Sequence, residues 1–277
     1  MSGTVSSARE EGRQGLMAVV RLEDFRRLWI GQIFSQLADK FYIVLMVFLI
    51  AQHWVSQVAQ SSGAMAEVAS AIRMDIETRA QRITLLATGI YVANTVPAVL
   101  LGMLAGVWAD RWPKRRVMVA SNAMRALLVL LAPVCLLPGP ELLGLSWGYW
   151  ALLLMTFLES VLTQFFAPAE QAAIPLLVPN KLLLAANSLY QATSMAATIV
   201  GFALGQPILR LLNQSLASLG LSGGEFLLLP FCYGMAALSL STIRLRETPS
   251  RPNNIGIGEE SREGLQVLVK RPTVRRA

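Results

Sequence analysis

Six long apolar stretches constrain this chain more than any other feature of its sequence. They run over residues 28–50, 83–109, 117–137, 142–166, 186–209 and 226–243, and about 20 helical residues are enough to cross the hydrocarbon core of a bilayer. Inside a membrane the backbone has no water to bond with, so helices satisfy their own polar groups there. The stretches predict an all-α integral membrane protein with six transmembrane helices, between a tail of residues 1–27 and a polar segment of residues 244–277.

The composition excludes an ordinary soluble protein and gives no support to an enzyme. Of the 277 residues, 54% are hydrophobic and 15% are charged, whereas soluble domains carry roughly 25% charged residues. The net charge of +7 comes from basic residues that lie mainly between the stretches, so we expect the lipid bilayer as a partner and no nucleic acid. The sequence offers one histidine and two separated cysteines, and neither a phosphate-binding loop nor a nucleophile elbow. We therefore expect no metal site, no cofactor and no enzyme activity.

The basic residues also predict an orientation. Eighteen Lys and Arg residues lie in the two tails and in the second and fourth connections. The other side has three, Arg73, Arg79 and Arg82. Since positive charge is retained in the cytoplasm, we expect both termini to be cytoplasmic in a multi-pass protein of the cell membrane. The long external connection, residues 51–82, has the pattern of a short helix outside the membrane, and residues 261–271 have that of a short amphipathic helix.

Polar residues within the apolar stretches are the candidates for function, because each is costly in lipid. Helical spacing places such residues on one face of the first, second, fourth and fifth stretches. The four sets are Gln32, Gln36 and Asp39; Thr84, Thr88, Tyr91 and Thr95; Thr156, Glu159 and Thr163; and Asn187, Gln191, Ser194 and Thr198. We expect these four helices to line an aqueous cavity and the other two to be peripheral. The open alternative is that the polar residues only form hydrogen bonds between helices.

The cavity and proton-pathway candidates are Gln32, Gln36, Asp39, Arg125, Glu159 and Gln191. Asp39 and Arg125 both lie near the middle of a stretch, so we expect them to offset each other as a buried pair; in the alternative they serve stability alone. The spacing G-x-x-x-G occurs twice, at Gly102 and Gly106 and at Gly201 and Gly205. Such glycines let neighbouring helices approach closely.

The turn between the second and third stretches carries a motif. Residues 106–116 read GVWADRWPKRR, which resembles the signature G-x-x-x-D-R-x-G-[RK]-[RK] of the major facilitator superfamily, with Pro113 in place of the signature glycine. The resemblance implies the N-terminal half of such a transporter, six helices built as a 3+3 inverted repeat. It also implies that helices 1, 2, 4 and 5 face a cavity or the other half, and that a cytoplasmic gate is formed by Gly106, Asp110, Arg111, Lys114 and Arg115.

A second resemblance narrows the group. The segments FFAPA at 165–169, IPLLVP at 174–179 and ANSL at 186–189 are similar to those of bacterial exporters of the enterobactin-exporter and macrolide-efflux type. The sequence FRRLW at 25–29 and Arg125 fit the same group, whereas Phe202 stands where exporters usually have proline. This resemblance implies a secondary active transporter that exports a small amphipathic compound, such as a drug or a siderophore, with proton antiport as one form of coupling.

The resemblance also implies a partner. A major facilitator has two halves around a central site, and this sequence ends before a seventh apolar stretch. We therefore expect a C-terminal half or a second copy of the chain as partner, together with a small-molecule substrate. The alternative is a truncated, non-transporting membrane remnant or partner subunit that keeps the half-fold.

Overall fold

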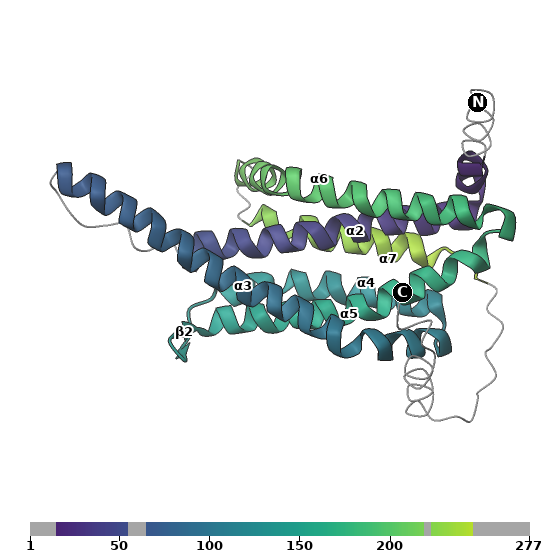
Figure 1. Ribbon diagram of the computed structural model, residues 1–277, viewed down its shortest axis with the longest axis horizontal. Helices are drawn as coiled ribbons and strands as arrows, with labels where there is room; N and C mark the ends of the chain where they lie inside the picture. The colour runs from purple at the N-terminus through teal and green to yellow at the C-terminus, as the bar shows by residue number, and fades with distance from the viewer. Residues whose placement is uncertain (1–14, 55–64, 219–222, 246–277) are drawn as a thin grey trace, which may run out of the picture.

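The structure is a computed structural model that describes residues 15–54, 65–218 and 223–245, and the element labels follow Figure 1. The side chains of residues 52, 54, 65–76, 103, 104 and 107–110 lie outside the description, and so does the amphipathic helix expected at 261–271. Six helices in the described ranges are long and apolar enough to cross a membrane, which confirms the number of helices predicted. They are α2 (Glu23–Leu49), α3 (Met65–Arg111), α4 (Lys114–Leu130), α5 (Trp147–Leu177), α6 (Leu183–Ala217) and α7 (Leu228–Ser241).

Helix α3 differs from the expected second helix because it starts much earlier. A separate short helix within 51–82 was expected, but residues 65–82 form the first turns of one continuous helix of 47 residues. The segment contains helix-forming residues and no glycine or proline before Gly89, so nothing in it interrupts the backbone hydrogen bonds. Figure 1 shows the start of α3 extending beyond the rest of the bundle.

Helix α5 ends later than the fourth stretch, and α4 ends earlier than the third. The chain stays helical to Leu177 through Pro168 and Pro175, since a membrane helix tolerates prolines where neighbouring groups satisfy the freed carbonyls. A 3₁₀ helix, η4 (Asn180–Leu182), leads into α6. After α4, Pro133 begins a second 3₁₀ helix, η3 (Ala132–Leu136).

A small hairpin precedes α5 and is the one departure from an all-α fold in the described ranges. Strands β1 (Glu141–Leu142) and β2 (Leu145–Ser146) pair antiparallel. The two residues of the turn, Leu143 and Gly144, have φ values of 55° and 76°, as a tight hairpin turn requires. The expected start of the fourth helix, at 142, therefore belongs to this hairpin, and α5 begins at Trp147.

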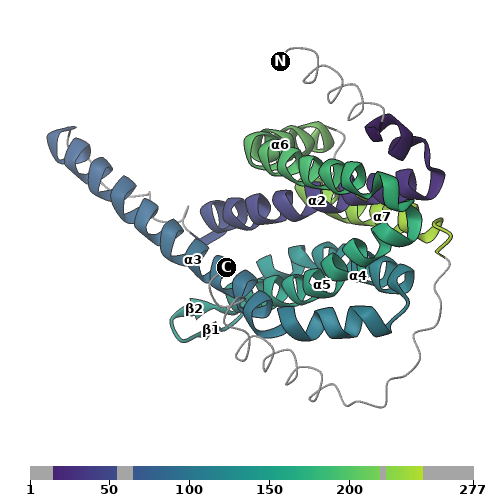
Figure 2. The ribbon, with the colours of Figure 1, turned by 45° about the vertical axis from the view of Figure 1, so that its right-hand side comes forward.

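Most of the closely packed helix pairs join helices that are not consecutive in the sequence. The close pairs are α2 with α6 and α7, α3 with α5, and α4 with α5 and α7. Figure 2 shows the result, with α2, α6 and α7 on one side of the bundle and α3, α4 and α5 on the other. Gly201 and Gly205 lie against α2, where a side chain at Gly201 would collide with Lys40, so close packing is confirmed for this pair. It is not found for Gly102 and Gly106, whose added Cβ atoms would meet nothing within 4 Å.

The buried apolar residues form two clusters separated by a polar layer. One cluster includes Tyr42, Leu45, Val129 and Leu152, and the other includes Phe25, Met118, Phe166 and Ile174. On α2, α4 and α5, the residues between the two clusters include polar side chains that are buried, namely Gln32, Ser35, Ser121, Asn122, Arg125, Thr156, Glu159 and Ser160. The core therefore places Arg125 and Glu159 at one level of the bundle.

Candidate functional site

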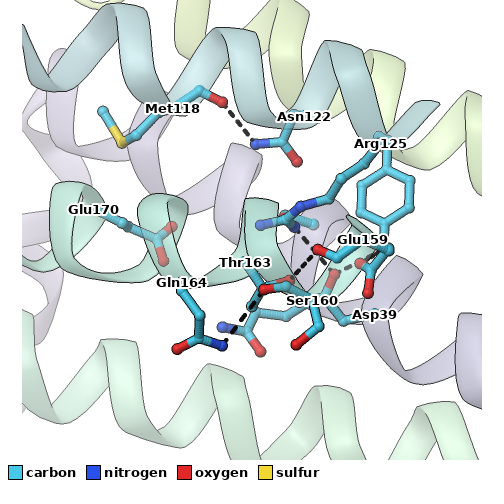
Figure 3. A network of polar contacts seen from close by, with 12 residues as sticks. Asp39, Met118, Asn122, Arg125, Glu159, Ser160, Thr163, Gln164 and Glu170 are labelled. Carbon is cyan, nitrogen blue, oxygen red and sulfur yellow. Dashed lines mark hydrogen bonds and ion pairs between the residues drawn. The ribbon is translucent and has the colours of Figure 1, made fainter. Parts of the chain in front are cut away.

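Arg125 of α4 lies at the centre of the polar layer (Figure 3). Its side chain is fully buried, and its Nη1 atom donates to Asp39 Oδ1 at 3.1 Å and to Ser35 Oγ at 3.3 Å. The guanidinium lies over the ring of Phe166, 4.9 Å from the centroid, and near that of Tyr233, at 5.5 Å. Ionic and cation–π contacts thus hold the cation in place. The buried pair of Asp39 and Arg125 expected from the sequence is present.

The hydroxyl group of Tyr233, from α7, joins two carboxyl groups from different helices. It lies 2.8 Å from Asp39 Oδ1 and 2.9 Å from Glu159 Oε1. A phenolic hydroxyl has one hydrogen to donate. For both contacts to be hydrogen bonds, one of the two carboxyl groups must carry a proton and donate it to the phenolic oxygen. The geometry therefore favours one proton shared by Asp39, Tyr233 and Glu159.

The charges of the group favour the same number of protons. Arg125 supplies one positive charge, whereas Asp39 and Glu159 would supply two negative charges if both were ionised. Glu159 is 4% exposed and the Asp39 side chain 19%. An unpaired charge at that depth costs several kcal/mol. One proton on the two carboxyl groups makes the three residues neutral together.

Hydroxyl groups around this centre form hydrogen bonds within and between the surrounding helices. The Tyr42 and Thr156 hydroxyls lie 2.9 Å apart and link α2 with α5. Ser160 donates to the Asn94 carbonyl of α3, and Thr163 donates to the backbone of its own helix at Glu159. No group of His, Cys, Asp or Glu side chains in the described ranges is arranged to hold a metal ion. The arrangement is suited to holding and moving protons.

The two glutamines of α2 form hydrogen bonds to α6. Gln32 is buried and its Nε2 donates to the Tyr190 carbonyl at 3.0 Å, while Gln36 Oε1 accepts from Ser194 Oγ at 3.5 Å. Both side chains thus link α2 to α6, as the alternative of interhelical hydrogen bonds predicts. Gln191, by contrast, is exposed on α6 and is not brought to Arg125.

The threonines of α3 do not reach the polar layer either. Thr84, Thr88 and Thr95 each donate to a carbonyl one turn earlier in their own helix and are exposed. The helices expected to be peripheral, α4 and α7, instead supply Arg125 and Tyr233. The helical spacing of the residues identified which faces of the helices are polar. It did not identify the helix against which each face packs.

A hollow of about 360 Å³ lies between α2 and α6, beside Tyr91 of α3. Its lining is largely apolar and also includes Gln206 and Arg210. None of the six cavity candidates lines this hollow. The polar layer and the hollow are therefore separate features of the described bundle.

Comparisons with known proteins identify the family to which the chain belongs. The family model described as Major Facilitator Superfamily matches residues 28–275. The chain belongs to the major facilitator superfamily. An uncharacterized MFS-type transporter of Mycobacterium bovis and one of Mycobacterium tuberculosis are each 31% identical to it over 113 residues. That stretch covers 41% of this chain and 24% of each relative's own length. No solved structure matches.

In this major facilitator protein the residues expected to form the gate lie where α3 ends and α4 begins. Arg111 is the last residue of α3 and Lys114 the first of α4, whereas the side chain of Asp110 lies outside the described residues. Gly106 is on the open face of α3. Arg115 donates to the Ser241 carbonyl, at the end of α7. A cation there is favourable because the last carbonyls of a helix lack partners.

A second arginine acts on the same helix end. Arg27 of α2 donates to the Thr242 carbonyl at 2.9 Å, and the Arg27 carbonyl accepts from Ser239 Oγ. Trp112 stacks on Phe165, with ring centroids 6.0 Å apart. Contacts from the motif region therefore hold α4 to α5 and α7 within this bundle.

Sequence reasoning missed Ser35 of the layer and three residues beside it: Tyr42, Tyr233 and Glu170. Tyrosines within an apolar stretch look like apolar residues, and a lone serine is common in membrane helices. The spacing of Asp39 and Tyr42, three residues apart, could have placed both on one face of α2. Glu170 lies beyond residue 166, where the expected fourth helix ended.

Proposed function

We propose that this chain is the N-terminal half of a secondary active transporter that exports a small amphipathic compound, such as a drug or a siderophore, in exchange for protons. The observation that carries the proposal is the Tyr233 hydroxyl between Asp39 and Glu159, beside the buried Arg125. Family membership supports transport across a membrane. The likeness of residues 165–189 to bacterial exporters supports export and an amphipathic substrate.

Proton exchange is supported by how this group balances charge. The proton shared by the two carboxyl groups lies between α2, α5 and α7, next to the cation on α4. Loss of that proton leaves a net negative charge in the core, and the bundle must then change its packing or gain a cation. The protonation state of the layer is thereby coupled to the arrangement of four helices.

The half-fold and its orientation are parts of the same proposal. Exchanging α2, α3 and α4 with α5, α6 and α7 leaves the set of close helix pairs unchanged, which supports a 3+3 repeat. The excess of basic residues in the tails and the second and fourth connections supports cytoplasmic termini in the cell membrane. Alternating access needs two halves that move around a shared site, so we propose a second six-helix unit, a C-terminal half or a second copy, as partner.

Flux measurements in proteoliposomes test the proposal. The chain is reconstituted with and without a matching C-terminal half, a pH gradient is imposed, and uptake is followed for lipophilic cations, macrolides and siderophores. We expect saturable, gradient-driven flux only with the second unit present. Asp39→Asn and Glu159→Gln should abolish it, whereas Glu141→Gln, in the exposed hairpin, should not.

One result would count against the proposal. Flux that is unchanged by both Asp39→Asn and Glu159→Gln would show that the shared proton has no role in transport. Saturable flux by the chain alone, abolished by those same substitutions, would instead identify the partner as a second copy of this chain rather than a C-terminal half.

A further inference from the structure

Glu170 is the ionisable residue of the core that the proposed function does not use. It lies in α5 between Pro168 and Pro175, and its side chain is 0% exposed. Its Oε2 atom accepts from the Tyr190 hydroxyl at 3.0 Å, whereas Oε1 is buried with no hydrogen-bond partner in the described part of the chain. No cation in the described ranges forms a salt bridge with it. An ionised carboxylate in that position costs several kcal/mol, so the arrangement fits the neutral, protonated acid.

Arg125 has the complementary unused atoms. Its Nη1 is bonded to Asp39 and Ser35, but Nε and Nη2 are buried without partners in the described ranges, as is Oδ1 of Asn122 one turn earlier on α4. Unused donors on Arg125 and an unused acceptor on Glu170 thus lie within or beside the polar layer. Figure 3 shows Arg125, Asn122 and Glu170 around one space.

The geometry of α5 explains why both acids are near Arg125. Glu159 and Glu170 are separated by about three helical turns and so lie on the same face of the helix. The guanidinium of Arg125 lies over the ring of Phe166, which is one turn before Glu170. Arg125 and Glu170 are not hydrogen-bonded to each other: Nη1 of Arg125 donates to Asp39 and Ser35, and Oε2 of Glu170 accepts from Tyr190.

We propose that Glu170 is a second proton-holding site and the alternative counter-ion of Arg125. This inference rests on the proposed function and extends it. In the described state Asp39 is ionised and paired with Arg125, and Glu170 is protonated. When Asp39 accepts a proton, Arg125 loses its counter-ion; Glu170 then releases its proton and pairs with the free Nε and Nη2 atoms.

Charge and protons balance in this exchange. One proton is gained at Asp39 and one is lost at Glu170, so the core carries the same net charge before and after. Tyr190 keeps donating to Glu170 and stabilises its ionised form. Tyr233 of α7 contacts Asp39 and Glu159, and Lys40 and Tyr42 of α2 lie on the side of Glu159. Glu159 is the competing acid for Arg125, because the Tyr233 hydroxyl joins it to Asp39.

Infrared spectroscopy of the purified full chain in lipid nanodiscs tests the inference without any transport. At neutral pH the absorption band of protonated carboxyl groups should be smaller in Glu170→Gln than in the original chain, by the contribution of one carboxyl group. Glu141→Gln, the matched control in the exposed hairpin, should leave it unchanged. An unchanged signal in Glu170→Gln would overturn the inference, because Glu170 would then be ionised in the resting protein.

A second set of infrared measurements tests whether Glu170 replaces Asp39 as the counter-ion of Arg125. In Asp39→Asn, Glu170 should ionise and its protonated-carboxyl signal should disappear. Asp39→Asn combined with Arg125→Met, which removes both charges, should restore the signal because no cation remains to pair with. Persistence of the Glu170 signal in Asp39→Asn would mean that Glu159 replaces Asp39, and would refute the exchange.

A thermal measurement separates this inference from the proposed function. The combination of Asp39→Asn and Glu170→Gln should lower the midpoint temperature of unfolding by more than the sum of the two single decreases, since Arg125 then loses both counter-ions. Additive decreases would overturn the inference. A protein that shows the exchange but no flux would instead contradict the proposed function alone.

Discussion

Removing one charge from the pair of Asp39 and Arg125 should cost about as much stability as removing both. Breaking a buried pair by deleting one partner typically costs about 3–5 kcal/mol. Asp39 is 19% exposed and keeps a hydrogen bond from Tyr233, so we place Arg125→Met near the lower limit, about 3 kcal/mol. Asp39→Asn removes the present counter-ion of a fully buried cation, and Glu170 must give up its proton to replace it, so we expect about 3 kcal/mol here too.

The double variant carries neither charge, so its loss should also be about 3 kcal/mol rather than the sum of about 6. With roughly 2–4 °C per kcal/mol for chains of this size, each single variant should unfold roughly 6–12 °C below the original chain. The assay follows the fraction of folded, monodisperse protein in detergent after heating, and gives the midpoint temperature of each variant.

The surface pair of Glu23 and Arg27 provides the matched control. Its atoms lie 2.5 Å apart, but its side chains are 64% and 29% exposed. Exposed pairs contribute about 0–1 kcal/mol, so Glu23→Gln should shift the midpoint by only a few degrees. If the losses at Asp39 and Arg125 add, the two residues are not energetic partners, and the argument from burial fails.

Three further outcomes follow from the same structure. A reporter active only in the cytoplasm should work when fused after Arg246 and be silent near Gly144; the reverse pattern would refute the orientation. Gly201→Ala should lower the midpoint temperature by the equivalent of about 1–3 kcal/mol through its collision with α2, while Gly102→Ala should leave it equal or raise it. Tyr233→Phe should cost about 1–2 kcal/mol of stability yet remove gradient-driven flux, and retained flux would argue against the bridge.

The sequence predicted the six helices and the central ion pair for the same physical reason. A bilayer excludes water, so its crossing segments must be long, apolar and helical. A charge within such a segment must meet an opposite charge or a polar group. Asp39 lies at mid-helix in α2 and Arg125 lies in α4. The two residues were therefore recognisable as partners from the sequence alone.

The residues that bridge this pair depend on long-range packing and could not be predicted in the same way. Tyr233 acquires its role because α7 lies against both α2 and α4, which no local pattern reveals. Gln191 was given a role because spacing showed a polar face, but spacing does not tell whether that face meets a helix or remains exposed. Glu170 lies beyond residue 166, where the expected fourth helix ended, whereas α5 continues through Pro168 and Pro175 to Leu177.

The position of the polar layer also bears on why the bundle contains charges at all. Apolar clusters on both sides of the layer already hold the helices together. Replacing a buried ion pair by apolar residues of similar volume is often neutral or stabilising, so folding alone does not require Arg125 or its acids. A cation with one bonded nitrogen and two unused ones, among three carboxyl groups on two helices, gives the core several protonation states of similar energy. Such a core can change state when a proton arrives, which an apolar core of the same shape could not do.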